Sequence, residues 1–314
     1  MAILYAAVAD LPAREVRERA PGEAAPLPRL PALEGLVARG EVRPAPSDWR
    51  RWALARAGLE AVAGDLPLGR LLAAAAGLRV EASDTWLAVA PLSLRAGLSA
   101  VRVGDTAIAP DAAGAARLAS LFNAEWASEA SSLHALGADL VLRHRARLEV
   151  ATVDPAHVLG RDLGGALPQG SDAPALVRLM TEIQMWLHAL PPEPAIAGIN
   201  GLWLWGAGQE PLSGTPRWPA FADFDPFLTA ARRAHPGPAR ADAELVRWSV
   251  ARLISTGATL AAADRKWFAP LAASLRSGRL AAAELHLLDS TVRLAARQRW
   301  RFWIRPQPWW ELGA

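Results

Sequence analysis

The spacing of apolar residues between positions 171 and 190 is that of an amphipathic helix. The apolar side chains recur at intervals of three and four, which places them on one face. They are Leu176, Leu179, Met180, Ile183, Leu187 and Leu190. Ser171 or Asp172 can cap the first turn, and Pro191 cannot continue the helix. We predict that this helix packs on a sheet, with Gln184 at the edge of the buried face, where its amide needs a partner in the core or in a ligand.

An apolar strand follows over residues 199–205, with the sequence INGLWLW. Large apolar groups on both faces are typical of a strand that helices cover on both sides, so we expect it to be central in its sheet. Gly206, Ala207 and Gly208 come next. Ligands bind beyond the carboxyl ends of strands in open α/β sheets, so this turn can bring the backbone close to a ligand. A plain tight turn is the alternative, because Pro211 stands where a dinucleotide-binding fingerprint needs glycine or alanine.

Strand and helix patterns alternate through the first 155 residues. Residues 3–8 predict a buried strand that ends at Asp10, and residues 30–40 predict a proline-led helix. Ser47 is the expected cap of the next helix. The other predicted elements are a helix over 66–78, a hairpin over 84–109, a helix over 111–129 and a strand over 139–151. A row of arginines on one face of the last strand protects a sheet edge or binds phosphate. Its members are Arg143, Arg145 and Arg147.

The segment after the apolar strand begins with a loop. Residues 209–219 are rich in Gly, Pro, Ser and Thr, which indicates a loop or a junction between lobes. Asp223 and Asp225 precede the next helix; two acids without further ligands make a poor metal site, so capping is the better interpretation. Further predictions are helices over 241–253 and 264–275, a strand pair over 284–294 and a last strand over 297–305.

Together these patterns predict an α/β protein with a mixed or mostly parallel sheet and helices on both faces. We expect an N-terminal lobe over 1–155 and a C-terminal lobe over 156–314, with the strand 199–205 at the centre of the second lobe. One continuous domain is the alternative, since 314 residues suit either arrangement.

Composition narrows the chemistry. The chain is 52% hydrophobic, has a net charge of +3 and contains no cysteine, which excludes disulfides, thiolate metal sites and cysteine nucleophiles. No apolar run approaches 18 residues and the N-terminus has no basic region before its apolar run, so we expect a cytoplasmic protein without a membrane span. Serine-hydrolase, zinc-protease and phosphate-loop motifs are all missing from the sequence. The 14 tryptophans indicate a closely specified core.

Five blocks of the sequence resemble a known bacterial family. They are VLGRDL (158–163), LVRLMTEIQMWLH (176–188), INGLWLWGAG (199–208), DRKWFAPLAASLRSGRL (264–280) and RWRFWIRP (299–306). The family is described as RpfE-type regulatory protein or as cofactor-independent phosphoglycerate mutase-like protein, and the resemblance implies an outline like that of the alkaline phosphatase superfamily. The family strand usually reads V-N-S-L-W-x-W-G-G-G, so Gly201 replaces a serine here. In that superfamily an aspartate after the first strand binds a metal, which implies Asp10 as the one matching position.

The resemblance and the missing motifs together favour a binding or regulatory role without catalysis. We expect a site at the loop after Trp205, formed by Arg161, Asp162, Gln184, Asn200, Trp205, Gly206 and Gly208. No cofactor is expected, and the partner is an unknown protein or a small phosphorylated ligand.

Two alternative functions remain open. The first is a metal-dependent phosphoglycerate mutase or phosphatase that uses Mn²⁺, Zn²⁺ or Mg²⁺, with Asp10 as a metal ligand and Ser47 as the nucleophile. A nucleic-acid accessory protein is the second, because arginines and tryptophans alternate in the last strand.

Overall fold

The structure is a computed structural model that describes residues 2–9, 27–46, 48–62, 64–96, 101–104, 108–126, 130–221, 225–249, 259–287, 289–295, 298 and 304–311. The chain forms two compact units. Unit 1 comprises Met1–Glu60, Gly214–Asp225 and Pro236–Ala314, and unit 2 comprises Ala61–Ser213 and Pro226–His235. The expected boundary at 155/156 falls inside unit 2, because strands on both sides of it pair in one sheet. The chain passes from unit 2 back to unit 1 at 213/214, which lies in the loop expected over 209–219.

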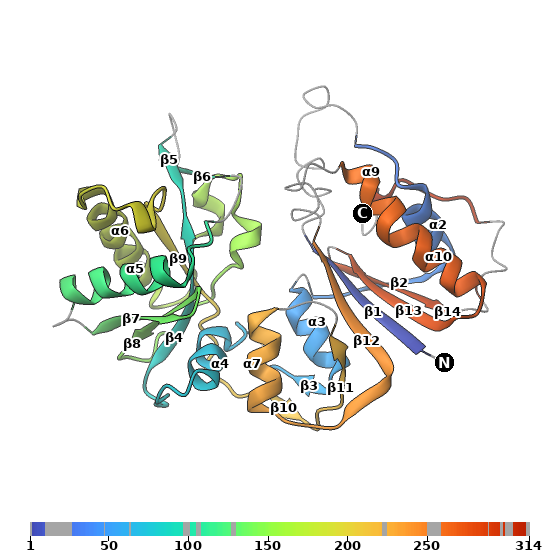
Figure 1. Cartoon of the computed structure of the whole chain (residues 1–314), viewed down its shortest axis with the longest axis horizontal. Helices are drawn as coiled ribbons and strands as arrows, with labels where there is room; N and C mark the ends of the chain where they lie inside the picture. Colours follow the sequence, from blue (N-terminus) through green and yellow to red (C-terminus); the bar gives the residue numbers. More distant parts are fainter. Residues whose placement is uncertain are drawn as a thin grey trace. The chain divides into compact units, whose positions relative to one another are not determined.

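Unit 1 is built on a mixed, mostly parallel sheet (Figure 1). Its order is β11 (Trp218–Phe221), β12 (Ala239–Ser249), β1 (Ala2–Ala9), β13 (Leu280–Leu287), β14 (Ser290–Ala295) and β2 (Glu41–Pro44). The first four strands are parallel, and β14 and β2 are antiparallel to their neighbours. The predicted α/β class is therefore confirmed, as are the first strand and the strand pair near the C-terminus.

Helices cover both faces of this sheet (Figure 1). One face carries α2 (Pro31–Arg39), α9 (Leu260–Ala263), a π-helical turn (Asp264–Phe268) and α10 (Ala269–Arg276). The other face carries α3 (Trp49–Arg56). β1 shows the division, because Ala6 and Val8 join the core under α2 and α10 while Tyr5 contacts Trp52 of α3. A short ribbon of β3 (Leu59–Glu60) and β10 (Ser213–Gly214) is also present.

Unit 2 contains an antiparallel four-stranded sheet. Its order is β7 (Ser131–Leu136), β8 (Asp139–His144), β4 (Thr85–Leu92) and β9 (Gly201–Trp205). The core of one face is completed by α5 (Ala112–Glu125) and α6 (Ala173–Ala189). The other face carries α4 (Leu68–Ala75), on which α7 (Pro226–Ala234) packs (Figure 1). The predicted amphipathic helix is thus confirmed, since Leu176, Ile183 and Leu187 are buried against this sheet.

The strand β9 differs from its prediction. All five of its residues are buried, as expected, but it is antiparallel to β4 and stands at the end of the sheet order within the described residues. Helices cover both faces of this antiparallel sheet, so β9 carries apolar side chains on both of its faces. Burial on two faces therefore did not identify a central parallel strand.

Residues 241–249 form part of a strand and not the predicted helix. Their alanine, glutamate and leucine are good helix formers, yet β12 pairs with β1 along seven residues, from Ala243 to Ser249. Long-range strand pairing overrides local propensity here.

Three smaller predictions also need correction. The hairpin is confined to β5 (Leu94–Ala96) and β6 (Val101–Val103), while β4 pairs with β8 and β9. β8 ends at His144 and lies inside its sheet, so the arginines at 143, 145 and 147 do not form a row on an edge strand. Asp172 stands at the N-cap of α6, but its carboxylate accepts the amide of Glu149 at 2.7 Å instead of capping the helix.

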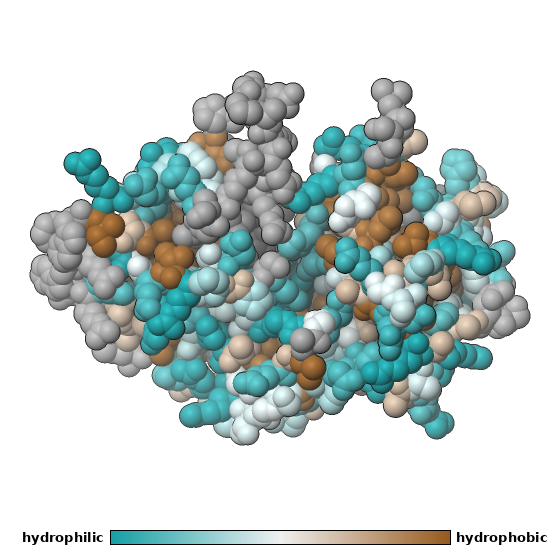
Figure 2. Space-filling view, turned by 180° about the vertical axis from the view of Figure 1, so that it is seen from behind, coloured by the Kyte–Doolittle hydropathy of each residue, from teal (hydrophilic) through white to brown (hydrophobic). Residues whose placement is uncertain are grey.

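Polar side chains cover much of the face seen in the space-filling view, and apolar residues gather there in small groups (Figure 2). The large apolar side chains exposed in the described part are Val42, Val62, Leu167, Met185 and Ile304. Within the described ranges, no helix has both the length and the apolar character needed to cross a bilayer.

Candidate functional site

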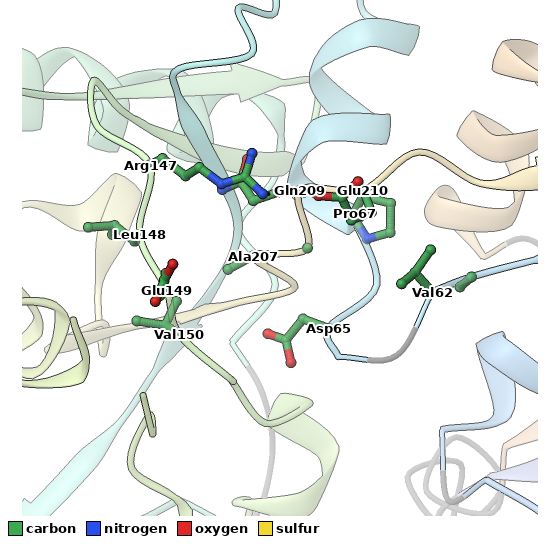
Figure 3. Close-up of a pocket in the computed structure, with 12 residues that line it drawn as sticks. Val62, Asp65, Pro67, Arg147, Leu148, Glu149, Val150, Ala207, Gln209 and Glu210 are labelled. Atoms are coloured by element: carbon green, nitrogen blue, oxygen red, sulfur yellow. Dashed lines mark hydrogen bonds and ion pairs between the residues drawn. The ribbon is translucent and has the colours of Figure 1, made fainter. Parts of the chain in front are cut away.

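A cavity of about 180 Å³ opens in unit 2 beside the loop that follows β9 (Figure 3). Three segments form its wall: 61–67 before α4, 147–150 after β8, and 207–210 after β9. Apolar contacts come mainly from Val62, Pro67, Leu148, Val150 and Ala207, and polar groups from Asp65, Arg147, Glu149, Gln209 and Glu210. The cavity is therefore lined by polar and charged groups together with apolar side chains.

Thr85, the first residue of β4, joins two of these segments. Its hydroxyl donates to the carbonyl of Ala146 at 2.9 Å and accepts the amide of Leu148 at 2.8 Å. It also accepts the side-chain amide of Gln209 at 2.7 Å. Thr85 is fully buried, so these bonds form without competition from water. They fix the distance between the 147–150 and 207–210 walls.

Thr152 joins the third segment to the other two. Its amide donates to Asp65 Oδ2 at 2.9 Å, and its hydroxyl donates to the same oxygen in a short bond. The hydroxyl oxygen accepts the amide of Gly206 at 2.8 Å. Figure 3 shows the Asp65 carboxylate directed across the cavity toward the 147–150 segment. Together Thr85 and Thr152 hold the cavity wall in a defined geometry.

The two positions after β9 require glycine because they pack closely on the segment that leads into α4. Gly206 has a φ of +68°, and its carbonyl accepts the amides of Leu68 and Gly69, which α4 leaves without a side-chain cap. A Cβ at Gly208 would lie 2.2 Å from the carbonyl oxygen of Asp65. The prediction placed this backbone next to a ligand; the close approach in the structure is to the protein's own chain, and the ligand contact stays a prediction. Gly208 nevertheless lines the cavity.

The charged groups of the cavity are mostly acidic. Arg147 reaches over the cavity and pairs with Glu210 at 3.0 Å (Figure 3). Both side chains are more than half exposed, so this ion pair contributes little stability. The carboxylates of Asp65 and Glu149 also line the cavity, where Glu149 accepts a hydrogen bond from Ser171 at 3.2 Å. One arginine faces three carboxylates, which gives the cavity a net negative charge.

Asn200 lies at the other end of β9 from the glycines. Its Oδ1 accepts the amide of Leu94 at 2.5 Å, and its Nδ2 donates to the carbonyl of Leu94 at 2.8 Å. The side chain therefore imitates one more residue of strand pairing, and both of its polar ends are used by the fold. The five residues of β9 lie between Asn200 and Gly206, which are therefore about 20 Å apart along the strand. The structure does not bring these two predicted site residues together.

The other predicted site residues are dispersed. Trp205 is buried, and its ring meets Phe227 of α7 edge-on at 5.1 Å. The backbone of Arg161 accepts the amide of Val103, and Asp162 forms an isolated β-bridge with Arg102. Gln184 lines a separate, mainly apolar cleft of about 60 Å³ between α6 and β9. The cavity after β9 thus contains only Gly208 from the predicted set.

The residues expected to act in a metal enzyme, Asp10 and Ser47, lie outside the described residues, as does Asp223. In the part of the chain that the structure covers, no group of three His, Asp or Glu side chains is arranged to hold a metal ion. Asp48 caps α3 through the amide of Arg50 at 2.8 Å, at the helix where Ser47 was the expected cap.

Burial affects the pKa of three histidines that stand on strands of the two sheets. Burial lowers the pKa of His286, whose Nε2 contacts the carbonyl of Pro46 at 2.7 Å. Burial also lowers the pKa of His144, which shares a hydrogen bond with Ser131, and of His134, which lies near Arg143. Each of these rings is packed within a sheet, and the neutral form is favoured in all three.

Sequence reasoning missed Asp65, Thr85, Thr152 and Glu149. Isolated threonines carry no pattern in a sequence, and their role arises from segments that are distant along the chain. The one available signal was Gly64-Asp65-Leu66-Pro67, since Asp next to Gly and Pro marks a structured turn.

No known family model matches the sequence, and no curated protein matches it significantly. Two solved structures are distantly similar in fold. Cofactor-independent phosphoglycerate mutase from Thermoplasma acidophilum shares 14% identity at a TM-score of 0.34, over 93% of this chain and 89% of that one. The PH0037 protein from Pyrococcus horikoshii shares 14% identity at a TM-score of 0.40, over 94% and 87%. The resemblance to RpfE-type proteins stays a prediction.

Proposed function

We propose that this chain is a binding protein, and that its ligand site is the cavity after β9. The observation that carries the proposal is the fixed wall of that cavity, in which Thr85 and Thr152 tie three separate segments together. A cavity whose wall is already ordered loses little entropy when a ligand enters, so more of the contact energy appears as affinity.

The charges of the cavity favour a small ligand that carries a positive group, such as an amine or a guanidinium. Three carboxylates and one arginine line the cavity, and the arginine is already paired with Glu210. An anionic phosphate would meet the carboxylates of Asp65, Glu149 and Glu210 there. Val62, Pro67 and Val150 offer apolar surface for the remainder of the ligand.

The contacts that the buried carboxylates make favour a binding role over phosphoryl transfer. Two-metal phosphoryl transfer requires several carboxylates with oxygens directed at one point. The buried carboxylates of the described chain belong to Glu34, Asp84, Asp225 and Asp264. The first three pair with arginines at 2.6 to 3.0 Å, and the fourth accepts two backbone amides. These acids hold the fold together.

The test is thermal unfolding with a panel of ligands: spermidine, arginine and ethanolamine on one side, and 3-phosphoglycerate with Mn²⁺, Zn²⁺ or Mg²⁺ on the other. A ligand at about 100 times its Kd stabilises the folded chain by about 2.7 kcal/mol. We expect an amine to raise the unfolding temperature by several degrees, and the metals to add nothing to any shift that 3-phosphoglycerate produces alone.

Matched variants locate the effect. Glu149→Gln and Glu210→Gln remove carboxylates from the cavity and should reduce the stabilisation by the amine at least several-fold. Glu182→Gln removes an exposed carboxylate of α6 that also pairs with an arginine, and it should not change the stabilisation. Equal losses in all three variants would contradict the site. A shift that needs both metal and phosphoglycerate would contradict the proposed function itself.

A further inference from the structure

Arg247 has an unusual environment on the sheet of unit 1. It lies on β12, two residues before the strand ends, and is in register with Ala7 of β1. Ala7 is in turn in register with His286, whose ring contacts Trp52 of α3. The Arg247 side chain therefore lies on the face that α3 covers, where its guanidinium stacks over the ring of Trp49 at 5.2 Å.

The Nε atom of Arg247 is buried and has no hydrogen-bond partner within the described part of the chain. Arg50 also stacks over Trp49, at 4.9 Å, and it pairs with Asp225 at 3.0 Å. The other arginine on this ring thus has a carboxylate partner. A buried donor of a charged group without an acceptor is costly, so such a group in a folded protein requires an explanation.

The position of Arg247 suggests what supplies the acceptor. It stands near the carboxyl ends of the parallel strands β12, β1 and β13, the region where open α/β sheets bind ligands. Guanidinium Nε and Nη donors bind two oxygens of a carboxylate or phosphate side by side. Arg247 is only partly buried as a whole residue, so an exchangeable anion can reach the rest of the group.

The surrounding groups are compatible with an anion. His286 is in register with Ala7, as Arg247 is. Burial lowers the pKa of His286, so the ring is neutral at pH 7 and does not compensate the charge of an anion. Arg50 adds a second positive charge beside Trp49, although Asp225 offsets it. Glu284 is in register with Tyr5, two residues before Ala7 on β1, and it accepts hydrogen bonds from Trp52 and Arg56. Arg247 is thus the group whose charge an anion would neutralise.

We propose that Arg247 anchors an oxyanion site at this end of the unit 1 sheet, which binds the phosphate or carboxylate group of a small ligand. The site is separate from the cavity of unit 2 and does not depend on the function proposed for it. A stacked arginine with a purely structural role is the competing explanation, and it predicts that anions do not bind.

The chain offers a matched control on the same strand. Arg240 also stacks on an aromatic ring, that of Tyr5 at 5.8 Å, but it pairs with Asp242 at 3.2 Å. Inorganic phosphate, acetate and 3-phosphoglycerate are titrated into the full chain at constant ionic strength, and binding is measured by calorimetry. Comparison of the three anions separates recognition of phosphate from recognition of carboxylate.

We expect binding of at least one anion, weakened tenfold or more in Arg247→Met and unchanged in Arg240→Met. Arg247→Lys keeps the charge but loses the paired donors, so it should weaken binding several-fold. If Arg247→Met does not fold, Arg247→Lys still tests the proposed anion site. The proposal is overturned if the unaltered chain binds none of the three anions, or if Arg247→Lys binds them as tightly as the unaltered chain.

Discussion

Asp264 supplies a cap to a helix that is 231 residues away in the sequence. Its Oδ1 accepts the amide of Leu33 at 2.9 Å, and its Oδ2 accepts the amide of Ala32 at 3.0 Å. These amides belong to the first turn of α2, where Leu30 provides no side-chain cap and Pro31 has no N–H. The carboxylate therefore satisfies both orphan donors of that turn and interacts favourably with the helix dipole.

Replacement of Asp264 by alanine removes both bonds. A hydrogen bond to a charged group contributes about 1.5 to 3 kcal/mol. Leu33 is fully buried, so its amide has no access to water in the variant, whereas the half-buried Ala32 can be rehydrated in part. We therefore expect Asp264→Ala to destabilise unit 1 by about 3 kcal/mol. Asp264→Asn keeps one acceptor and should cost about 2 kcal/mol.

Hydrogen exchange measured by mass spectrometry is the suitable assay, because a chain with two units need not unfold in one step. It reports the loss of protection over residues 31–39 separately from unit 2. Asp111→Ala is the control: Asp111 caps α5 through one bond, to the amide of Gly114 at 2.7 Å, and its loss should cost about 1 kcal/mol. If Asp264→Ala costs no more than Asp111→Ala, the reasoning about two orphan amides is refuted.

Two glycines and the histidines provide further predictions. Gly208→Ala should destabilise unit 2 by about 1 to 3 kcal/mol and weaken ligand binding, because a Cβ would meet the Asp65 carbonyl. Gly35→Ala lies in a helix with free space around it and should stabilise the protein by about 1 kcal/mol. Urea unfolding measures both changes. Burial lowers the pKa of three histidines below 6.5, so the unfolded chain takes up protons first and stability should fall as pH drops below about 6.5. His286→Gln should reduce this dependence by up to about 1.4 kcal/mol per pH unit, and an unchanged slope would contradict the assignment.

Local patterns predicted elements correctly where one stretch of chain determines them. The stripe of α6, the proline-led start of α2 and the turn between β13 and β14 are all encoded within a few residues. Neighbours in a sheet are not encoded locally. The antiparallel pairing of β9 with β4 joins residues more than 100 positions apart, and the pairing of β12 with β1 overrides a helical composition.

The candidate site was predicted only in part for the same reason. Gly206 and Gly208 were predicted to bring the backbone close to a ligand, but the sequence could not show that they pack on the segment before α4. Asn200 was predicted as a ligand-binding residue, but the sequence could not show that both polar ends of its side chain bond to the backbone of Leu94. Thr85 and Thr152 act only through contacts made after folding.

The position of β1 inside its sheet has a consequence for the synthesis of the chain. β1 precedes unit 2 in the chain, yet both strands that flank it, β12 and β13, come after all of unit 2. The strands of unit 2 are complete at Trp205, so its sheet can form on the ribosome while β1 still has two unpaired edges. An apolar strand with free edges is a template for pairing with other nascent chains. We expect chaperones that protect nascent chains to act chiefly on this first strand.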